Sequence, residues 1–218
     1  LIIKNNINHV AMIMDGNARW AKKNKVSKKE GYKKGLEKIN QITDICIENK
    51  IKYLTLFALS TENIQRRSIN IIFNIINNNY NYFVNEMSNK KKVKIKIIGK
   101  RNNLSSNIKE KIFELEKKTI NNKLLNLNIA FNYGFINELL YLVNNIVNLS
   151  SNKKIVINES LIRNNLYLPN TPDPDILIRT GGFNRLSNFF LLQLSYTELF
   201  FTKTLWPDLS KKEVLEIF

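Results

Sequence analysis

Two hydrophobic patterns alternate along this chain. Short apolar runs rich in β-branched and aromatic residues are separated by longer stretches in which apolar residues recur every three or four positions. The runs predict buried strands, and the stretches predict amphipathic helices. We expect strands at His9–Met14, Tyr53–Leu59, Val93–Ile98, Leu127–Asn132, Asp175–Arg179 and Phe189–Gln193, and helices at about Gly31–Lys50, Ser68–Met87, Ser105–Thr119 and Ile136–Leu149.

This alternation is typical of an α/β fold with a central, largely parallel β-sheet flanked by helices. No repeat or linker divides the 218 residues, so we expect a single domain spanning residues 1–218. The chain ends in KKEVLEIF, which has a helical period. We therefore expect that the chain stops inside a helix and that a C-terminal tail is missing.

The charge adds an expectation about partners. Thirty-four Lys and Arg against eighteen Asp and Glu give a formal charge of +16. Such an excess attracts nucleic acid, an acidic membrane face or phosphorylated small molecules, and does not choose among them. Because Asn and Lys are abundant throughout, many lysines are equally well explained as solvent-exposed residues with no binding role.

The single cysteine and the lack of a long apolar segment bear on the compartment. Cys46 lies at helical spacing with neighbouring isoleucines, which indicates a core thiol, and one cysteine excludes an internal disulfide and a cysteine metal cluster. No run approaches the roughly 20 apolar residues of a transmembrane helix. We expect a cytoplasmic protein, or one held peripherally at a membrane such as the endoplasmic reticulum.

The glycines indicate where a ligand binds. Of seven glycines, four follow predicted strands: Gly16, Gly134, Gly181 and Gly182. In open α/β sheets, ligands bind in the crevice beyond the carboxyl ends of the strands. The sequence therefore predicts one site at that edge.

The first strand end reads MDGNARW, from Met14 to Trp20. Asp15 is a hard oxygen ligand suited to Mg²⁺, and the backbone that follows at Gly16 and Asn17 suits a phosphate at a helix start. Arg19 adds a planar donor fork for phosphate oxygens. A helix-capping Asp with a surface Arg explains the stretch equally well.

The second strand end reads ALSTENIQRR. A capping box explains Ser60 or Thr61 well. It does not explain Arg66 and Arg67, because cations in the first turn of a helix are unfavourable unless an anion is present. The segment therefore predicts a second group of anion ligands.

A third group follows the fifth strand. Arg179, Arg185 and Ser187 flank a Gly-Gly turn, an arrangement suited to clasping a phosphate group. Two arginines in a loop are usually only solvated, but these lie beside apolar strands and another strand end also carries arginine, which favours a phosphate site. Downstream, Glu198 is either a salt-bridged core acid or a second metal ligand, and the pattern favours neither.

Several chemistries are excluded or disfavoured. His9 is the only histidine, which excludes His-cluster metal sites and disfavours Ser-His-Asp catalysis. There is no G-x-x-x-x-G-K-[ST] nucleotide-binding motif. The residues therefore predict a protein that binds phosphates through arginines and one metal-binding carboxylate.

Four segments together resemble one enzyme family. HVAMIMDGNARWA, LSTENIQR, NIAFNYG and PDILIRTGGFNRLSNFFLLQLSYTELFFTKTLWPDL are similar, in the same order, to the signature regions of the cis-prenyltransferases, the family of undecaprenyl and dehydrodolichyl diphosphate synthases. They span His9 to Leu209, nearly the whole chain. The resemblance implies repeated addition of isopentenyl diphosphate to an allylic diphosphate such as farnesyl diphosphate. The product would be a cis-polyprenyl diphosphate, precursor of a dolichol- or undecaprenol-type carrier lipid.

The resemblance also implies roles for individual residues. Asp15 would hold Mg²⁺ against the allylic diphosphate, Glu198 would help to bind the metal, and Asn63 would assist proton removal. Gly16, Asn17, Ala18, Arg19 and Arg66 would hold the allylic diphosphate, and Arg179, Arg185 and Ser187 the isopentenyl diphosphate. Further substrate contacts are expected at Trp20, Lys28, Tyr32, Ser60, Thr61, Glu62 and Leu186, although Trp20 alternatively only packs the helix.

A tunnel for the growing chain is also implied, with the Ser68–Met87 helix and the strand around Ala58 as candidate walls. Some positions depart from the family pattern. Tyr32 stands where histidine is common, Lys28 replaces a common arginine, Ile64 stands where tryptophan is usual, and Phe183 where glutamate is frequent. These departures affect details of substrate binding and leave the reaction class unchanged.

The resemblance implies a homodimer or a heterodimer with a related subunit, because family members use C-terminal residues in dimer contacts and across the neighbouring site. One alternative is a non-catalytic subunit of a two-component enzyme; the intact first motif favours the catalytic interpretation. A nucleic-acid-binding protein is a further alternative, suggested by the positive charge. The sequence contains no recognisable nucleic-acid-binding motif, so we expect no nucleic acid partner.

Overall fold

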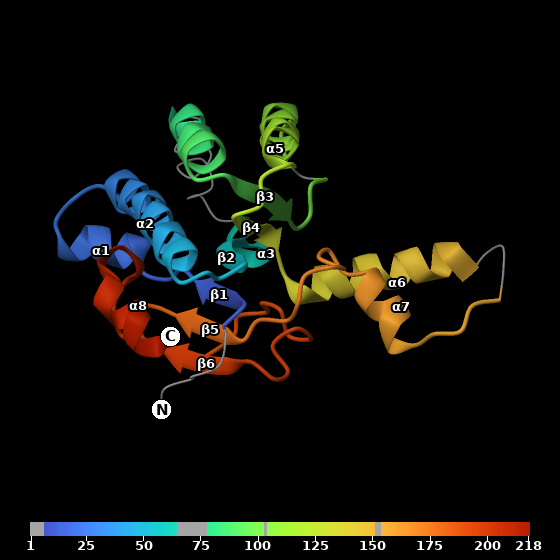
Figure 1. Ribbon diagram of the computed structural model, residues 1–218. Coiled ribbons are helices and arrows are strands. Elements are labelled where there is room, and N and C mark those ends of the chain that lie inside the picture. The colour runs from blue at the N-terminus through green and yellow to red at the C-terminus, as the bar shows by residue number, and fades with distance from the viewer. Residues whose placement is uncertain (1–6, 65–77, 103, 151–153) are drawn as a thin grey trace.

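The sheet of this protein is parallel throughout. The computed structural model describes residues 7–64, 78–102, 104–150 and 154–218 (Figure 1). Within them, six strands are ordered β3-β4-β2-β1-β5-β6, and every neighbouring pair runs parallel. The strands are β1 (His9–Ile13), β2 (Tyr53–Ser60), β3 (Val93–Ile98), β4 (Leu125–Tyr133), β5 (Ile176–Arg179) and β6 (Glu198–Phe201). The predicted fold class is confirmed.

Helices connect these strands. They are α1 (Asn17–Lys23), α2 (Lys28–Glu48), α3 (Thr61–Ile64), α5 (Ser106–Thr119), α6 (Phe135–Ser150), α7 (Glu159–Asn164) and α8 (Lys211–Ile217), with the π-helix η1 (Asn85–Lys90) and the 3-10 helix η2 (Trp206–Asp208). Side chains of Ser27, Ser105, Asn158 and Ser210 cap helix starts by accepting a backbone N–H bond. Because Ser27 is a cap, α2 begins three residues before its predicted start.

One face of the sheet carries the larger core. Residues from α2, α5, α8 and the segment 78–90 pack on it in one apolar cluster, and Figure 1 shows α2 and α5 lying above the sheet. Cys46 is fully buried there, and burial raises the pKa of its thiol to about 12, as expected for a core cysteine. Of the predicted Ser68–Met87 helix, residues 78–84 are helical, whereas Ile72 and Ile76 lie outside the described residues.

The other face corrects one strand prediction. Residues Phe189–Gln193 form turns that cover the sheet, and the sixth strand lies later, at Glu198–Phe201. Phe189 and Phe190 are both fully buried, although successive residues of a strand point to opposite faces. Positive φ angles at Asn188 and Phe190 turn the backbone so that both rings reach the same core cluster. A continuous apolar run does not reveal such a turn, because strand and buried loop share it.

The ladder between β2 and β4 is irregular near the carboxyl edge. Phe57 pairs with Ala130 and Leu59 with Phe131, so Ala58 is an extra residue in β2. Between Phe131 and Tyr133, Asn132 is the corresponding extra residue in β4, with a φ of 52°. Such bulges re-aim side chains next to binding sites. The two irregularities compensate, and the strands leave the sheet in register.

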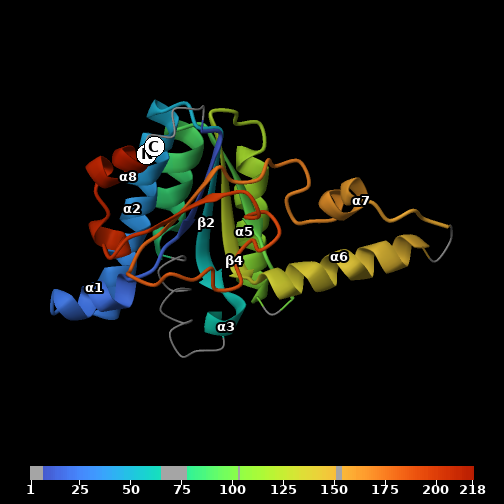
Figure 2. The same ribbon diagram turned by 90° about the horizontal axis from the view of Figure 1, so that it is seen from below.

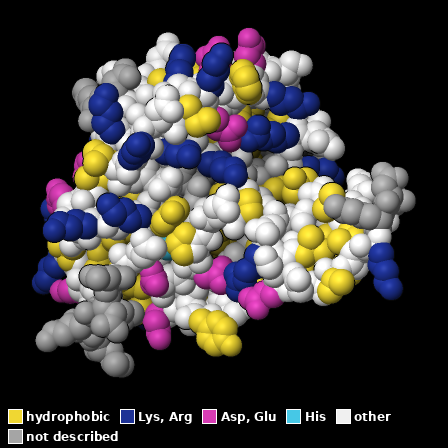
Figure 3. Space-filling view, turned by 45° about the vertical axis from the view of Figure 1, so that its right-hand side comes forward, with side chains coloured by type: hydrophobic (Ala, Val, Ile, Leu, Met, Phe, Trp, Pro, Cys, Tyr) yellow, Lys and Arg dark blue, Asp and Glu magenta, His cyan; other side chains and the backbone are white. Residues whose placement is uncertain are grey.

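Helices α6 and α7 extend to one side of the sheet as an arm (Figure 2). Much of α6 is apolar and exposed: Ile136, Leu139, Leu140, Tyr141, Val143, Val147 and Leu149. Figure 3 shows apolar side chains gathered on this arm, whereas Lys and Arg side chains spread over the upper part of the same face. In the described part of the chain, no helix is long and apolar enough to cross a membrane.

The single histidine ties three strands together. Nδ1 of His9 lies 2.6 Å from the carbonyl oxygen of Pro172, and Nε2 lies 2.7 Å from Oγ1 of Thr55. Thr55 Oγ1 also accepts a bond of 3.1 Å from the amide of Asn128 on β4. Burial lowers the pKa of His9 from 6.5 to about 4, against weaker opposing effects of the Pro172 carbonyl and of Asp175.

This burial predicts acid sensitivity. Because the folded pKa lies below the unfolded one, the contribution of His9 is complete above about pH 6.5 and is lost as the pH falls toward 4, by roughly 3 kcal/mol in total. Urea unfolding at several pH values should show this slope. The variant His9→Gln, which takes up no proton, should show a flatter dependence; equal slopes would contradict the assignment.

Candidate active site

The predicted ligand groups lie at one edge of the sheet. β2, β1 and β5 are neighbours and parallel, so their carboxyl ends meet. Asp15 follows β1, Ser60 ends β2, and Arg179 ends β5. Gly134 follows β4, which lies next to β2. The structure thus brings together segments separated by more than a hundred residues, as the glycine positions predicted.

Asp15 lies between two arginines. Its Oδ1 is 2.9 Å from NH2 of Arg19, and its Oδ2 is 3.1 Å from NH2 of Arg179. The Asp15 side chain is 30% exposed, so it can reach a ligand from the solvent side. Because one carboxylate meets two guanidinium groups, the cluster keeps a net positive charge and attracts anions.

Both terminal nitrogens of the Arg179 guanidinium make hydrogen bonds. Its NH1 donates to Oγ of Ser187 at 2.8 Å and to the carbonyl oxygen of Arg185. The Arg179 side chain is only 3% exposed, and burial lowers its pKa from the ordinary arginine value, although Asp15 partly offsets this effect. Nε of Arg179 is buried without a hydrogen-bond partner among the described residues. A fixed guanidinium with an unused donor is suited to an anionic ligand.

Thr180 was not singled out in the sequence, and Gly181 only as a glycine after a strand, yet both shape this cluster. Oγ1 of Thr180 accepts the N–H bond of Asp15 at 3.0 Å and lies 2.8 Å from the Asp15 carbonyl oxygen. Gly181 has a φ of +88°, and its carbonyl accepts a 2.6 Å bond from Arg19. A Cβ at Gly181 would collide with the Arg19 guanidinium. The I-R-T-G-G segment therefore positions Asp15 and Arg19 as well as its own arginine.

Helix α1 approaches α2 closely. A Cβ at Gly31 would collide with the backbone oxygen of Asn17, and a Cβ at Gly35 with the Asn17 amide oxygen. The four-residue spacing of these glycines places both on one face of α2. Oδ1 of Asn17 is buried and has no partner among the described residues. It is a second polar atom that a ligand could satisfy.

The Ser60 segment is tied to the fifth strand's loop by Asn188. Nδ2 of Asn188 donates to Oε1 of Glu62 at 3.3 Å, and the backbone carbonyl of Asn188 accepts the N–H bond of Phe135 at 2.7 Å. Oγ of Ser60 accepts the N–H bond of Asn63 at 3.3 Å, and Oγ1 of Thr61 accepts from Asn137 at 3.1 Å. Ser60 therefore caps the start of α3, which is the alternative that the sequence offered for this residue. Arg66 lies outside the described residues.

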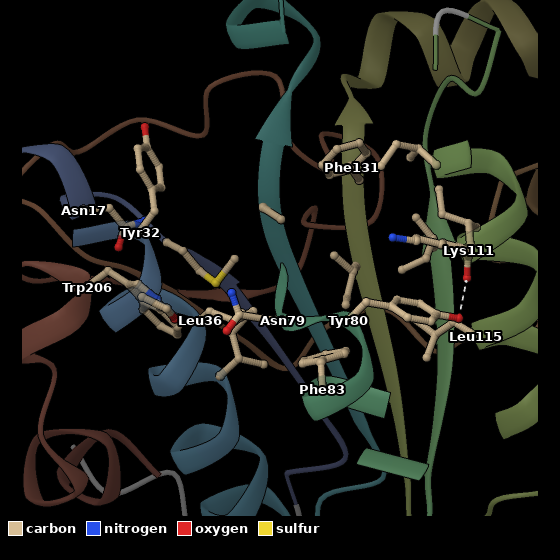
Figure 4. Close-up of a pocket in the computed structure, with 18 residues that line it drawn as sticks. Asn17, Tyr32, Leu36, Asn79, Tyr80, Phe83, Lys111, Leu115, Phe131 and Trp206 are labelled. Carbon is tan, nitrogen blue, oxygen red and sulfur yellow. Dashed lines mark hydrogen bonds between the residues drawn. The ribbon is translucent and has the colours of Figure 1, made fainter. Parts of the chain in front are cut away.

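The cluster adjoins an apolar pocket of about 180 Å³ (Figure 4). Met14 and Asn17 line the pocket on the side of Asp15, and Tyr80 and Lys111 line another part of it. The hydroxyl of Tyr80 donates to the carbonyl oxygen of Lys111 at 3.1 Å. The remaining lining residues come mainly from α2, the sheet and α5: Tyr32, Gly35, Leu36, Ile39, Ala58, Asn79, Phe83, Ile97, Ile108, Ile112, Leu115, Ile129, Phe131 and Trp206. Ala58 and the described part of the predicted Ser68–Met87 helix do line a cavity.

Comparisons with known proteins agree with this arrangement. The family model described as "Putative undecaprenyl diphosphate synthase" matches residues 13–218. The chain belongs to the undecaprenyl diphosphate synthase family. Isoprenyl transferase from Rickettsia felis is 43% identical over 98% of this chain and 90% of that protein, and isoprenyl transferase from Thermotoga maritima is 41% identical over 95% and 90%.

Solved structures give the same family. The crystal structure of lavandulyl diphosphate synthase from Lavandula x intermedia, in complex with dimethylallyl diphosphate, has a TM-score of 0.92 and 30% identity, over 97% of this chain and 93% of that one. A probable undecaprenyl diphosphate synthase from Campylobacter jejuni has a TM-score of 0.81 and 32% identity, over 98% and 93%. As a member of the undecaprenyl diphosphate synthase family, the chain is a prenyl-transferring enzyme, which confirms the predicted enzyme class.

The other residues expected at the family's site are spread more widely. Nε1 of Trp20 donates to Oδ1 of Asp208 at 2.6 Å, so this side chain joins α1 to η2. Ala18, Lys28 and Arg185 are exposed, and Leu186 packs against the core cluster of Phe189. Tyr32 lines the pocket, and its pKa is raised by burial and by the negative charge of Asp15.

Glu198 does not join Asp15 within one chain. It begins β6, pairs with Ile176, and is therefore level with Val10 of β1. Val10 lies three residues, roughly 10 Å, before the end of β1. Glu198 is exposed, so the structure does not support the core-acid interpretation. Any shared metal role with Asp15 would need a second chain.

The residues at Asp15 fit the Mg²⁺ that the family resemblance implied. Among the described residues, no three His, Cys, Asp or Glu side chains form a complete metal cage. Mg²⁺ usually binds through one or two carboxylates together with substrate phosphates and water. A single partly exposed carboxylate beside two arginines has this chemistry.

Proposed function

We propose that this protein condenses isopentenyl diphosphate repeatedly onto an allylic diphosphate such as farnesyl diphosphate and makes a cis-polyprenyl diphosphate. This product would be the precursor of an undecaprenol- or dolichol-type carrier lipid. One observation carries the proposal: the cluster of Asp15, Arg19 and Arg179 adjoins an apolar pocket that Met14 and Asn17 line. A charged head and a hydrocarbon tail would therefore bind side by side.

The cluster has the charges that the reaction needs. When the allylic bond breaks, negative charge grows on the leaving diphosphate, and fixed cations lower the barrier by stabilising that charge. Mg²⁺ on Asp15 would supply further positive charge. Arg19 and the backbone at Gly16, Asn17 and Ala18 would bind the allylic diphosphate, supported by Arg66.

A second diphosphate would bind on the side of the fifth strand. Arg179 already bonds the Arg185 carbonyl and the Ser187 hydroxyl there, and it has one unused donor. Holding both substrates next to one another turns their encounter into an intramolecular step, which lowers the entropic cost of reaction. Asn63, exposed on the short helix α3, is proposed to assist removal of the proton.

The apolar pocket would take the growing chain, and Ala58 is placed to limit it. Ala58 lines the pocket from the bulge in β2. The graded series Ala58→Val, Ala58→Leu and Ala58→Phe should give progressively shorter products, because each larger side chain fills more of the cavity. Chromatography of the labelled products measures the lengths. Products of unchanged length from a fully active Ala58→Phe enzyme would show that Ala58 does not limit the growing chain.

A second chain is part of the proposal. Tyr196 is fully exposed, and Leu199 and Phe201 of the edge strand β6 are 43% and 37% exposed, as are many apolar residues of α6. Unpaired strand edges and apolar patches of this kind favour association. A dimer, with itself or a related subunit, would cover them and could bring Glu198 toward a neighbouring site. A light-scattering mass of one chain, with and without such a subunit, would contradict the dimer.

The decisive experiment is incubation of the purified protein with MgCl₂, farnesyl diphosphate and labelled isopentenyl diphosphate. Extended products with new cis double bonds are expected, and omission of the metal with added chelator should stop their formation. No product, with or without a related subunit, would overturn the proposed function. Products with trans double bonds would place the enzyme in a different reaction class.

A further inference from the structure

Phe183 lies among three arginines. Its ring centroid is 4.6 Å from Cζ of Arg185, 4.9 Å from Cζ of Arg19, and 5.9 Å from Cζ of Arg179. Each distance falls within the roughly 6 Å over which a guanidinium is attracted to an aromatic face. The three arginines come from different segments of the chain, and this ring is a neighbour that all three share.

The charges around the ring are unbalanced. Asp15 pairs with Arg19 and with Arg179. Among the described residues, no carboxylate lies within ion-pair distance of Arg185, and its guanidinium lies over the Phe183 ring. Three cations therefore share one carboxylate and one neutral aromatic ring.

A neutral ring affects these cations differently from an acid. Three guanidinium groups repel one another, and exposed arginine side chains lose conformational freedom when a ligand fixes them. The ring attracts each of them without cancelling charge, so their full attraction for an anion is kept. A carboxylate at the same position would also gather the arginines, but it would compete with the anion for them.

The exposure of Phe183 supports a role at the site. Its side chain is 42% exposed, whereas nearby Phe189 and Phe190 are fully buried in the core. Residue 183 directly follows Gly181 and Gly182, whose positive φ angles of +88° and +78° turn the chain back toward Arg19. Loss of the ring should therefore change the cluster more than the stability of the fold.

We propose that Phe183 is a positioning residue of the diphosphate site, an aromatic plate that holds the guanidinium groups of Arg19, Arg179 and Arg185 in place without neutralising them. The proposal rests on the proposed function, since it assigns diphosphate groups to these arginines. Phe183 acts through the arginines, so it should contribute to substrate binding and little to the chemical step.

Calorimetric titration with inorganic diphosphate, in MgCl₂, tests the plate directly. Phe183→Leu keeps an apolar side chain and removes the ring, and we expect diphosphate to bind about 5- to 20-fold more weakly, since each lost contact is modest. Phe183→Tyr restores the ring and should bind within about twofold of the native protein. Phe183→Glu should bind more weakly than Phe183→Leu, because its carboxylate competes with the ligand.

Coupling to Arg185 separates a cation–π contact from a general change in shape. In an Arg185→Gln background, Phe183→Leu should weaken binding less than it does in the native protein. In turnover assays, KM for the substrates should rise several-fold in Phe183→Leu, with kcat changed less than about threefold. Unfolding curves of all variants check that they are folded, and Phe183→Met replaces Phe183→Leu if that variant is not.

The outcomes separate the two proposals. If the native protein does not bind diphosphate, the assigned site itself is wrong and the proposed function loses its support. If the native protein binds diphosphate and Phe183→Leu binds it equally well, only the plate is overturned. A Phe183→Tyr variant as weak as Phe183→Leu, or an undiminished Phe183 effect without Arg185, would also overturn the plate.

Discussion

Replacing Asp15 with alanine should lower kcat by about 10³-fold or more while the protein stays folded. In the described part of the cluster, Asp15 is the carboxylate that contacts Arg19 and Arg179, and it is the residue that we propose binds Mg²⁺. Removing one preorganised electrostatic group from an active site commonly costs 10²- to 10³-fold, and the loss of a metal ligand adds to this. Turnover at saturating farnesyl and isopentenyl diphosphates measures the effect.

Two further variants sharpen this test. Asp15→Asn keeps the shape and acceptor oxygen of the side chain but removes its charge, so it should be impaired nearly as much as Asp15→Ala. Asp44→Ala removes an exposed carboxylate on α2 whose ion-pair partner is Lys91, and it should retain turnover. Near-normal activity of Asp15→Ala would refute the assigned metal role.

Replacing Trp206 with alanine should lower the free energy of unfolding by about 3–5 kcal/mol, the usual cost of removing a buried large aromatic side chain. Trp206 is 1% exposed, its Nε1 donates to the carbonyl of Gly35 at 2.8 Å, and its backbone N–H donates to the carbonyl of Asp15 at 3.0 Å. The side chain thus joins η2 to α2, and its backbone joins η2 to the Asp15 segment. Urea denaturation measures the loss.

Trp20→Ala is the matched control for Trp206→Ala. Trp20 is only partly buried, and its indole N–H bonds the exposed side chain of Asp208, so its removal should cost markedly less. Equal losses in the two variants would contradict the larger contribution assigned to the buried Trp206 side chain.

The fold could be predicted where the hydrophobic pattern has a period. Five strands and the main helices α2, α5 and α6 follow from local patterns, because burial on one helix face or inside a parallel sheet dictates them. The prediction of a strand at Phe189–Gln193 was wrong because a buried turn and a buried strand share the same apolar composition. The sixth strand was missed because β6 is an exposed edge, with the burial pattern of a surface segment.

The candidate site was predicted from residue types at strand ends, but its supporting contacts were not. Asp15, Arg19 and Arg179 carry charges that need an explanation, so they are visible in the sequence. Thr180 and Asn188 act through hydrogen bonds to segments far away in the sequence, and nothing in their own neighbourhood indicates those partners. The glycine spacing of Gly31 and Gly35 was a usable signal for close helix approach.

The paired bulges of β2 and β4 restrict how this protein can change its length. Ala58 lines the pocket and Asn132 lies across the ladder, yet each is the counterpart that restores the other's pairing. Deleting either one alone would slip the strand by one residue and turn its following side chains to the opposite face. Related sequences are therefore expected to keep both residues or to lack both, so the lengths of β2 and β4 change together.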